Sequence, residues 1–115
     1  MLDVQLFSEE DGIVVARLVG ELVGAQVPDV TETLQEAATG DSARLAIDLT
    51  KLTLLDSSGL AALIHLANRA RLTCGKLVLV NPSAFVSGVF RTTRLDRWFD
   101  IARDMTAARQ FLTEP

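Results

Sequence analysis

One stretch decides the fold of this 115-residue chain: residues 45–60, Leu-Ala-Ile-Asp-Leu-Thr-Lys-Leu-Thr-Leu-Leu-Asp-Ser-Ser-Gly-Leu. Its apolar beginning, residues 45–49, predicts a buried β-strand. A short link then leads to Asp-Ser-Ser-Gly at residues 56–59, after which apolar residues recur at helical spacing. The junction therefore joins a strand to an amphipathic helix. Ser57 or Ser58 is the expected N-cap, since serine is a favoured residue at that position.

Upstream of the junction, the patterns predict a hairpin and a helix. Apolar and polar residues alternate over 2–7, and β-branched residues crowd positions 13–19, so two paired strands are expected. Residues 20–24 are expected to end the second strand. Pro28 suits the first turn of a following helix, and the C-cap of that helix is expected at Gly40.

Downstream of the junction, strand and helix patterns alternate again. Residues 76–80 are almost all apolar, which predicts a strand that is covered on both faces or lies centrally in a sheet. A third helix is expected to start at residues 81–83, Asn-Pro-Ser. A turn and a short last strand follow over residues 95–101, and Asp104 is in position to cap a final helix.

The predicted order of elements is ββαβαβαβα. Strands joined by helices favour parallel pairing with right-handed crossovers, whereas the first two strands form an antiparallel hairpin. We therefore predict a single α/β domain over residues 1–115. It contains a mixed, mostly parallel sheet with an N-terminal hairpin and about four helices packed against it.

Composition and charge argue against several classes of protein. The net charge is −4 and the 11 Lys and Arg residues form no basic run, which argues against a direct nucleic-acid partner. No apolar run approaches the roughly 18 residues of a membrane span, and residues 1–5 lack the features of a signal peptide. We therefore expect a cytoplasmic protein without membrane insertion. The single Cys74 and the single His65 leave no internal disulfide and no structural zinc site, so no metal is expected.

The hydroxyls of Ser57 and Ser58 allow two interpretations. The first is structural, because a capping serine stabilises a helix by about 1 kcal/mol relative to alanine, which accounts for one of the two. The second is functional. A phosphoryl group on Ser57 would lie at the positive end of the helix dipole and add roughly −1.5 to −2 charges beside Asp56. Such a charge would oppose a partner without refolding the domain, and the four residues alone leave both interpretations open.

Four stretches of the chain resemble the STAS family, the fold of bacterial anti-sigma factor antagonists. They are residues 20–22 (Gly-Glu-Leu), 56–60 (Asp-Ser-Ser-Gly-Leu), 75–82 (Gly-Lys-Leu-Val-Leu-Val-Asn-Pro) and 95–96 (Leu-Asp). The second stretch is the specific one, and the others support it. In the family the first hydroxyl after the Asp is the phosphorylation site, so the resemblance implies that role for Ser57.

The resemblance also implies partners. A family antagonist binds an anti-sigma factor that is itself a serine kinase, and this binding releases the sigma factor. The kinase then uses ATP to phosphorylate the antagonist, which ends the interaction, and a serine phosphatase restores it. The resemblance leaves room for a weak homodimer, and it implies no catalytic residue and no cofactor in the domain itself.

Two positions depart from the family pattern. Val23 stands where the family usually has an Asp close to the acceptor serine, and the missing carboxylate bears on the efficiency of phosphorylation. Residues 92–94, Thr-Thr-Arg, stand where the family has Leu-Thr-Gly, which alters a loop or marks a different partner surface. Val23 favours an alternative function. This is a STAS scaffold or accessory subunit that is not phosphorylated, for example in a lipid-trafficking ABC transporter or a stress-signalling complex.

The expected partner surface surrounds the junction and follows the helix face opposite the apolar stripe. Small alanines on that face allow a partner to approach closely. The predicted partner-binding residues are Glu21, Val23, Asp56, Ser57, Ser58, Gly59, Ala61, Ala62 and His65. An enzyme is the weakest class, because the carboxylates of Asp48 and Asp56 lie on different stretches with no His or glycine-rich loop beside them.

Overall fold

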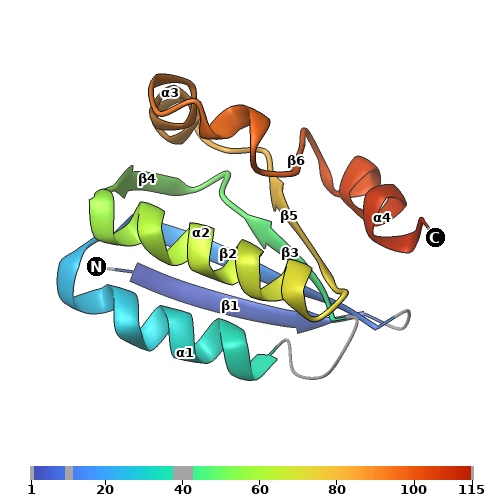
Figure 1. The fold of residues 1–115 in the computed structure, drawn as a ribbon. Coiled ribbons are helices and arrows are strands. Elements are labelled where there is room, and N and C mark those ends of the chain that lie inside the picture. The colour runs from blue at the N-terminus through green and yellow to red at the C-terminus, as the bar shows by residue number, and fades with distance from the viewer. Residues whose placement is uncertain (1, 10–11, 38–42, 115) are drawn as a thin grey trace.

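The structure, a computed structural model, describes residues 2–9, 12–37 and 43–114 (Figure 1). The described residues form six strands, four α-helices and two 3₁₀ turns. In chain order these are β1 (Leu2–Ser8), β2 (Ile13–Leu22), η1 (Gly24–Gln26), α1 (Val27–Ala37), β3 (Arg44–Asp48), β4 (Leu52–Leu55), α2 (Ser57–Leu72), β5 (Lys76–Val80), α3 (Ala84–Thr92), η2 (Leu95–Arg97), β6 (Ile101–Ala102) and α4 (Met105–Thr113).

The strands form one mixed sheet in the order β1-β2-β3-β5-β6. β1 and β2 pair antiparallel as a hairpin, and β2, β3, β5 and β6 pair parallel along the sheet. Each parallel connection carries a helix, as the alternating pattern of the sequence predicts. The predicted fold class is therefore confirmed, with an N-terminal hairpin, a mostly parallel sheet and four helices against it.

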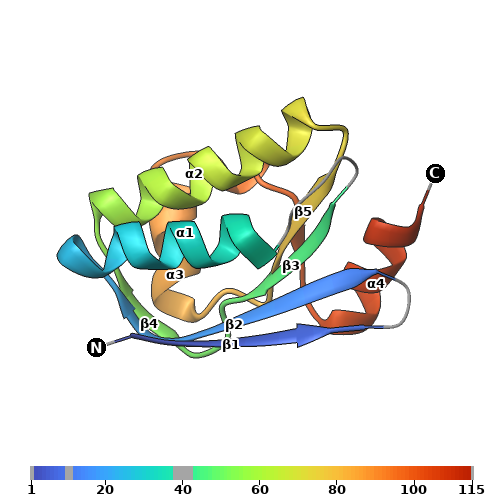
Figure 2. The ribbon, with the colours of Figure 1, turned by 90° about the horizontal axis from the view of Figure 1, so that it is seen from below.

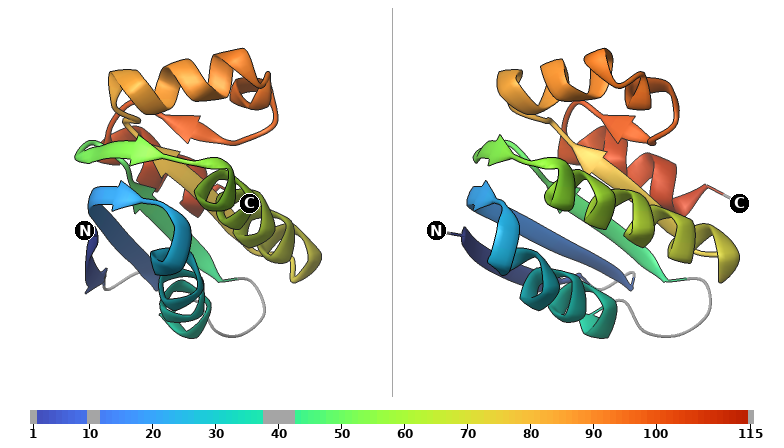
Figure 3. Two further views of the ribbon diagram at one scale, coloured as in Figure 1. Left: turned by 90° about the vertical axis from the view of Figure 1, so that its left-hand side faces the viewer. Right: turned by 60° about the vertical axis from the view of Figure 1, so that its left-hand side comes forward.

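Helices cover both faces of the sheet (Figures 2 and 3). α1, α2 and α3 lie on one side of the sheet, and α4 lies on the other. Successive side chains of a strand point to opposite faces, so Leu45 and Ile47 of β3 enter the core under α1 and α2 while Ala46 enters the core under α4. β5 divides in the same way, which explains why a strand covered on both faces reads as an unbroken apolar run.

The second strand ends within residues 20–24 as predicted, although it is three residues longer than the expected 13–19. β2 continues to Leu22, but its register shifts between Gly20 and Glu21, and Gly20 has a φ of 114° that glycine adopts at little cost. The last residues of β2 then pair with β4, a strand that the sequence pattern treated as a short link. β4 adds a sixth strand to the predicted five, and it brings the chain directly to the start of α2 (Figure 1).

The cap of α2 also differs from the prediction. Asp56 is the N-cap, and Ser57 and Ser58 are the first two residues of the helix. The predicted start of the third helix is confirmed, since α3 begins at Ala84 with Ser83 as its N-cap. The predicted cap of the last helix is also confirmed, because the Asp104 carboxylate accepts a hydrogen bond from Ala107 N at the start of α4. The predicted C-cap of α1, Gly40, lies outside the described residues.

Candidate functional site

The candidate site is the junction where β4 ends and α2 begins. Asp56 holds this junction with both carboxylate oxygens. Its Oδ1 accepts a hydrogen bond from Gly59 N at 2.8 Å, which caps α2, and its Oδ2 accepts one from Gly24 N at 2.9 Å. The second bond reaches across 32 residues to the start of η1. One side chain thus fixes the helix and ties the loop after β2 to it.

Ser57 and Ser58 are both exposed on the first turn of α2. The first N–H groups of a helix have no partner within the helix. Here the Asp56 side chain accepts a hydrogen bond from Gly59 N, and the Asp56 backbone carbonyl accepts one from Leu60 N. The N–H groups of Ser57 and Ser58 are the two that remain in this turn. An anion on the Ser57 hydroxyl would therefore meet the positive end of the helix dipole and donors that the cap leaves available.

Gly59 lies beneath the two serines and is buried. A Cβ at this position would come within 2.4 Å of the Leu22 carbonyl oxygen and 2.8 Å of Leu55 Cδ1. The absence of a side chain lets α2 begin directly against β2 and β4. Close packing is therefore what this glycine provides.

The exposed face of α2 runs from Ser58 through Ala61 to His65. The outward orientation predicted for Ala62 is wrong, because this residue is buried with an exposed fraction of 8%. α2 packs against α1 as well as the sheet, so its buried face is wider than a single stripe. Of the two alanines predicted to face outward, Ala61 is the exposed one.

Glu21 and Val23, the predicted partner-binding residues from outside α2, are both half-buried. Glu21 lies on β2 and pairs in register with Leu54 of β4. Val23 immediately precedes Gly24, whose N–H donates to Asp56, so the loop carrying Val23 is attached to the start of α2. The structure thus brings residues that are more than thirty positions apart in the sequence to one end of the sheet.

Asp48, the other carboxylate considered for chemistry, has a structural role. Its Oδ1 accepts hydrogen bonds from Thr50 N and Thr50 Oγ1, and Arg17 Nε lies 3.4 Å from its Oδ2. These contacts stabilise the turn between β3 and β4 and occupy both oxygens. In the part of the chain that the structure describes, no group of three His, Cys, Asp or Glu side chains is arranged to hold a metal ion.

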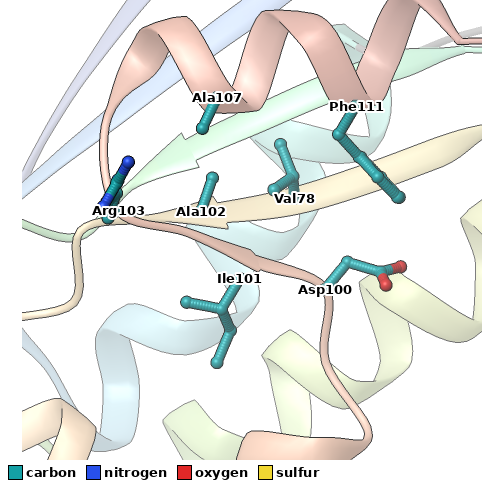
Figure 4. A pocket seen from close by; sticks show the side chains of 7 residues that line it. All are labelled: Val78, Asp100, Ile101, Ala102, Arg103, Ala107 and Phe111. Atoms are coloured by element: carbon teal, nitrogen blue, oxygen red, sulfur yellow. The ribbon is translucent and has the colours of Figure 1, made fainter.

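A hollow of about 450 Å³ lies at the other edge of the sheet, between β6 and α4 (Figure 4). The side chains of Ala102 and Ala107 are small and leave this space open, while Ile101 points to the opposite side of the strand. The lining residues are Val78, Asp100, Ile101, Ala102, Arg103, Ala107 and Phe111. The hollow reaches β5 through Val78, and β3 separates β5 from β2, which pairs with β4, so the hollow is separate from the candidate site.

The comparisons with known proteins agree with this geometry. The model of the STAS domain matches residues 7–108. The chain belongs to the STAS family. Within the described residues of this STAS domain, no helix has the length and apolar character needed to cross a bilayer.

Solved structures share the fold of this STAS domain. A protein from Thermotoga maritima, described as a candidate anti-sigma factor antagonist, is 17% identical with a TM-score of 0.85, over 96% of this chain and 95% of that one. An anti-sigma factor antagonist from Mycobacterium paratuberculosis is 22% identical with a TM-score of 0.78, over 99% and 96%. The Bacillus cell fate determinant SpoIIAA in its phosphorylated form is 25% identical with a TM-score of 0.72, over 95% and 99%.

Sequence reasoning missed the bond between Asp56 and Gly24, the most informative contact of the site. The sequence does carry one signal for it, since an Asp directly before two serines is itself a favoured N-cap residue with a second oxygen to spare. Nothing local indicates that this oxygen meets a loop 32 residues away.

Proposed function

We propose that this STAS domain is a cytoplasmic anti-sigma factor antagonist whose binding to a serine-kinase anti-sigma factor ends when Ser57 is phosphorylated. The observation that carries the proposal is the exposed Ser57 hydroxyl on the first turn of α2, beside a cap that is supplied by Asp56. Because the cap does not use the serine, its hydroxyl is available for another purpose.

The electrostatics of the junction support a charge switch. A phosphoryl group would add roughly −1.5 to −2 charges next to the Asp56 carboxylate, which already carries a negative charge. The helix dipole and the first-turn N–H groups lower the cost of this charge to the domain itself. A partner that accepts the neutral surface of Ser57, Ser58 and Ala61 would then meet a concentrated anion, so binding weakens while the fold persists.

The phosphorylated form of SpoIIAA, the structural relative at 25% identity, supports the same assignment. In the proposed cycle the anti-sigma factor releases its sigma factor on binding this domain, the kinase activity of the anti-sigma factor then phosphorylates Ser57, and a serine phosphatase reverses the modification. The domain acts in this cycle as substrate and binding partner rather than as an enzyme.

We expect Val23 to make phosphorylation of Ser57 slow. The Asp56–Gly24 bond holds the loop of Val23 at the start of α2, and an apolar side chain there cannot supply the carboxylate that the family usually places near the acceptor. We expect slow phosphorylation of the native chain and faster phosphorylation of Val23→Asp, measured as initial rates with the same kinase. Equal rates would show that this carboxylate is not needed.

The decisive experiment incubates the domain with its cognate anti-sigma kinase and ATP and locates phosphate by mass spectrometry. Ser57→Ala is expected to accept none, while the matched neighbour Ser58→Ala is modified like the native chain. Ser57→Asp is expected to weaken kinase binding by about tenfold or more, with unchanged circular dichroism, because it adds charge at the contact. Phosphate on Ser57→Ala would reject the assignment. Co-purification with a transporter ATPase, without a kinase, would favour the accessory-subunit alternative.

A further inference from the structure

Three arginines lie together where α3 ends. Arg91 is in the last turn of α3, Arg94 follows the helix, and Arg97 ends η2. With Asp96 they line a hollow of about 460 Å³, which we call the arginine hollow. All three arginines are exposed, and they come from elements that do not contribute to the Ser57 junction.

The side chains of the arginine hollow are unpaired within the described residues. Within the described residues, no carboxylate lies within 4 Å of any of its three guanidinium groups, and this includes the carboxylate of Asp96. Two other arginines of the chain have ion-pair partners: Arg17 pairs with Asp48, and Arg109 pairs with Glu9. The hollow therefore concentrates positive charge that the fold itself does not use.

Arg94 stands at a position that suits glycine better. Its backbone is left-handed, with φ 61° and ψ 19°, a conformation that strains residues with a side chain and that glycine adopts freely. This backbone conformation ends α3, and Arg94 N donates to Arg91 O at 3.1 Å, but the Arg94 side chain makes no hydrogen bond or ion pair within the described residues. Its guanidinium instead extends the charge of the hollow.

The hollow is built on a rigid base. Arg71 of α2 donates a hydrogen bond to the Trp98 carbonyl oxygen at 2.6 Å and lies over the Trp98 ring at 4.1 Å. The Trp98 ring packs against Phe99, which packs in turn against Phe90 of the core. These contacts fix the backbone of η2 against α2 and α3, so the points from which the three arginine side chains extend are held close together.

We propose that the arginine hollow docks an acidic segment of a partner protein. Guanidinium groups bind carboxylates through paired N–H donors, and three of them suit a short run of Asp or Glu. The rest of the domain disfavours a larger polyanion. The net charge is −4, and without these three positive charges it is −7, so a nucleic acid or an anionic bilayer would be repelled around the hollow. This surface is independent of Ser57 and stands whether or not that serine is modified.

The test measures fluorescence polarisation of a labelled peptide of alternating Glu and Gly residues, with a Gln–Gly peptide as control. The native domain is expected to bind the Glu peptide, and binding weakens as salt rises. Replacing Arg91, Arg94 and Arg97 together by Gln is expected to weaken it by about tenfold, and each single change by about two- to fivefold. Arg103→Gln, an exposed arginine outside the hollow, is the matched control and should bind as the native domain does.

Arg94→Gly separates docking from folding. It removes a charge and relieves the left-handed strain, so the peptide should bind more weakly while the urea midpoint rises. The proposal is overturned if the native domain shows no saturable binding of the Glu peptide at low salt, or if the triple variant binds as the native domain does. An equal loss in Arg103→Gln overturns it too. Tighter binding of a DNA duplex or of phosphatidylserine vesicles than of the peptide would reject an acidic protein as the partner.

Discussion

Replacing Asp56 removes two hydrogen bonds that serve different purposes. Oδ1 caps α2 through Gly59 N, and Oδ2 holds the loop after β2 through Gly24 N. Asp56→Asn keeps an acceptor for the cap but offers the loop an amide NH₂, which cannot accept. Asp56→Ala removes both acceptors. The pair of variants therefore separates the loop contact from the cap.

The expected losses of unfolding free energy follow from the two bonds. An N-cap replaced by alanine costs about 1 kcal/mol. The bond to Gly24 is charge-assisted but exposed, so we place its contribution below the roughly 1.5–3 kcal/mol of hydrogen bonds to charged groups, at about 1 kcal/mol. We expect Asp56→Asn to lose about 1 kcal/mol and Asp56→Ala about 2 kcal/mol, a large part of the stability of a domain this size. Urea unfolding followed by circular dichroism measures both values.

Asp104→Ala is the matched control, because Asp104 caps α4 through one bond to Ala107 N at 2.8 Å and no second bond through its side chain is found in the described residues. It should lose about 1 kcal/mol, the cost of a cap alone. Equal losses in Asp56→Ala and Asp104→Ala would refute the two-bond interpretation. A native-like Asp56→Asn would show that the loop contact adds nothing.

Three further predictions concern single positions. Gly59→Ala should destabilise the domain by about 1–3 kcal/mol in thermal melts, because the added Cβ would lie 2.4 Å from the Leu22 carbonyl oxygen. Gly88→Ala, whose Cβ would meet open space, should instead stabilise the domain by up to about 1 kcal/mol through helix propensity. Similar melting points for the two variants would contradict this prediction. A side-chain hydrogen bond from Arg109, helped by its charge, lowers the pKa of Glu9 below its ordinary value of 4.5. The stability that this carboxylate contributes is therefore present above pH 4.5 and is lost as pH falls through the lowered pKa. Carbon NMR titration should show a lowered pKa for Glu9 in the native domain and an ordinary pKa for Glu9 in Arg109→Gln. Arg94→Gly should gain about 1 kcal/mol in urea unfolding by relieving left-handed strain, and a lower midpoint would argue against strain there.

The elements that the sequence predicted well depend on local signals. Residues 76–80 form a strand as predicted, since an apolar run between a glycine and an Asn-Pro pair has few other ways to be buried. Asp104 caps α4 because a capping carboxylate three residues before a free N–H needs no distant partner. Local signals of this kind also placed Ser57 at the start of a helix.

The elements that it missed depend on distant contacts. β4 is only four residues long, and two of them are exposed, so its pattern resembles a loop. It is a strand because β2 shifts register at Gly20 and offers its last residues as a partner. Ala62 is buried for a similar reason, since α1 packs beside α2 and covers a side that the helix pattern alone leaves to solvent.

The sequence by itself determined that an acid, two hydroxyls and a glycine open a helix at residues 56–59, because these depend only on spacing and residue type. The tertiary structure decided which of them does what. Gly59 packs against the Leu22 carbonyl, and this close approach sets where α2 begins. Asp56 then becomes the cap and the anchor of a loop 32 residues away, and the serine hydroxyls are left at the surface. Asp56, Ser57 and Ser58 are all residue types that favour the N-cap position, and packing across the sheet determines which of them occupies it.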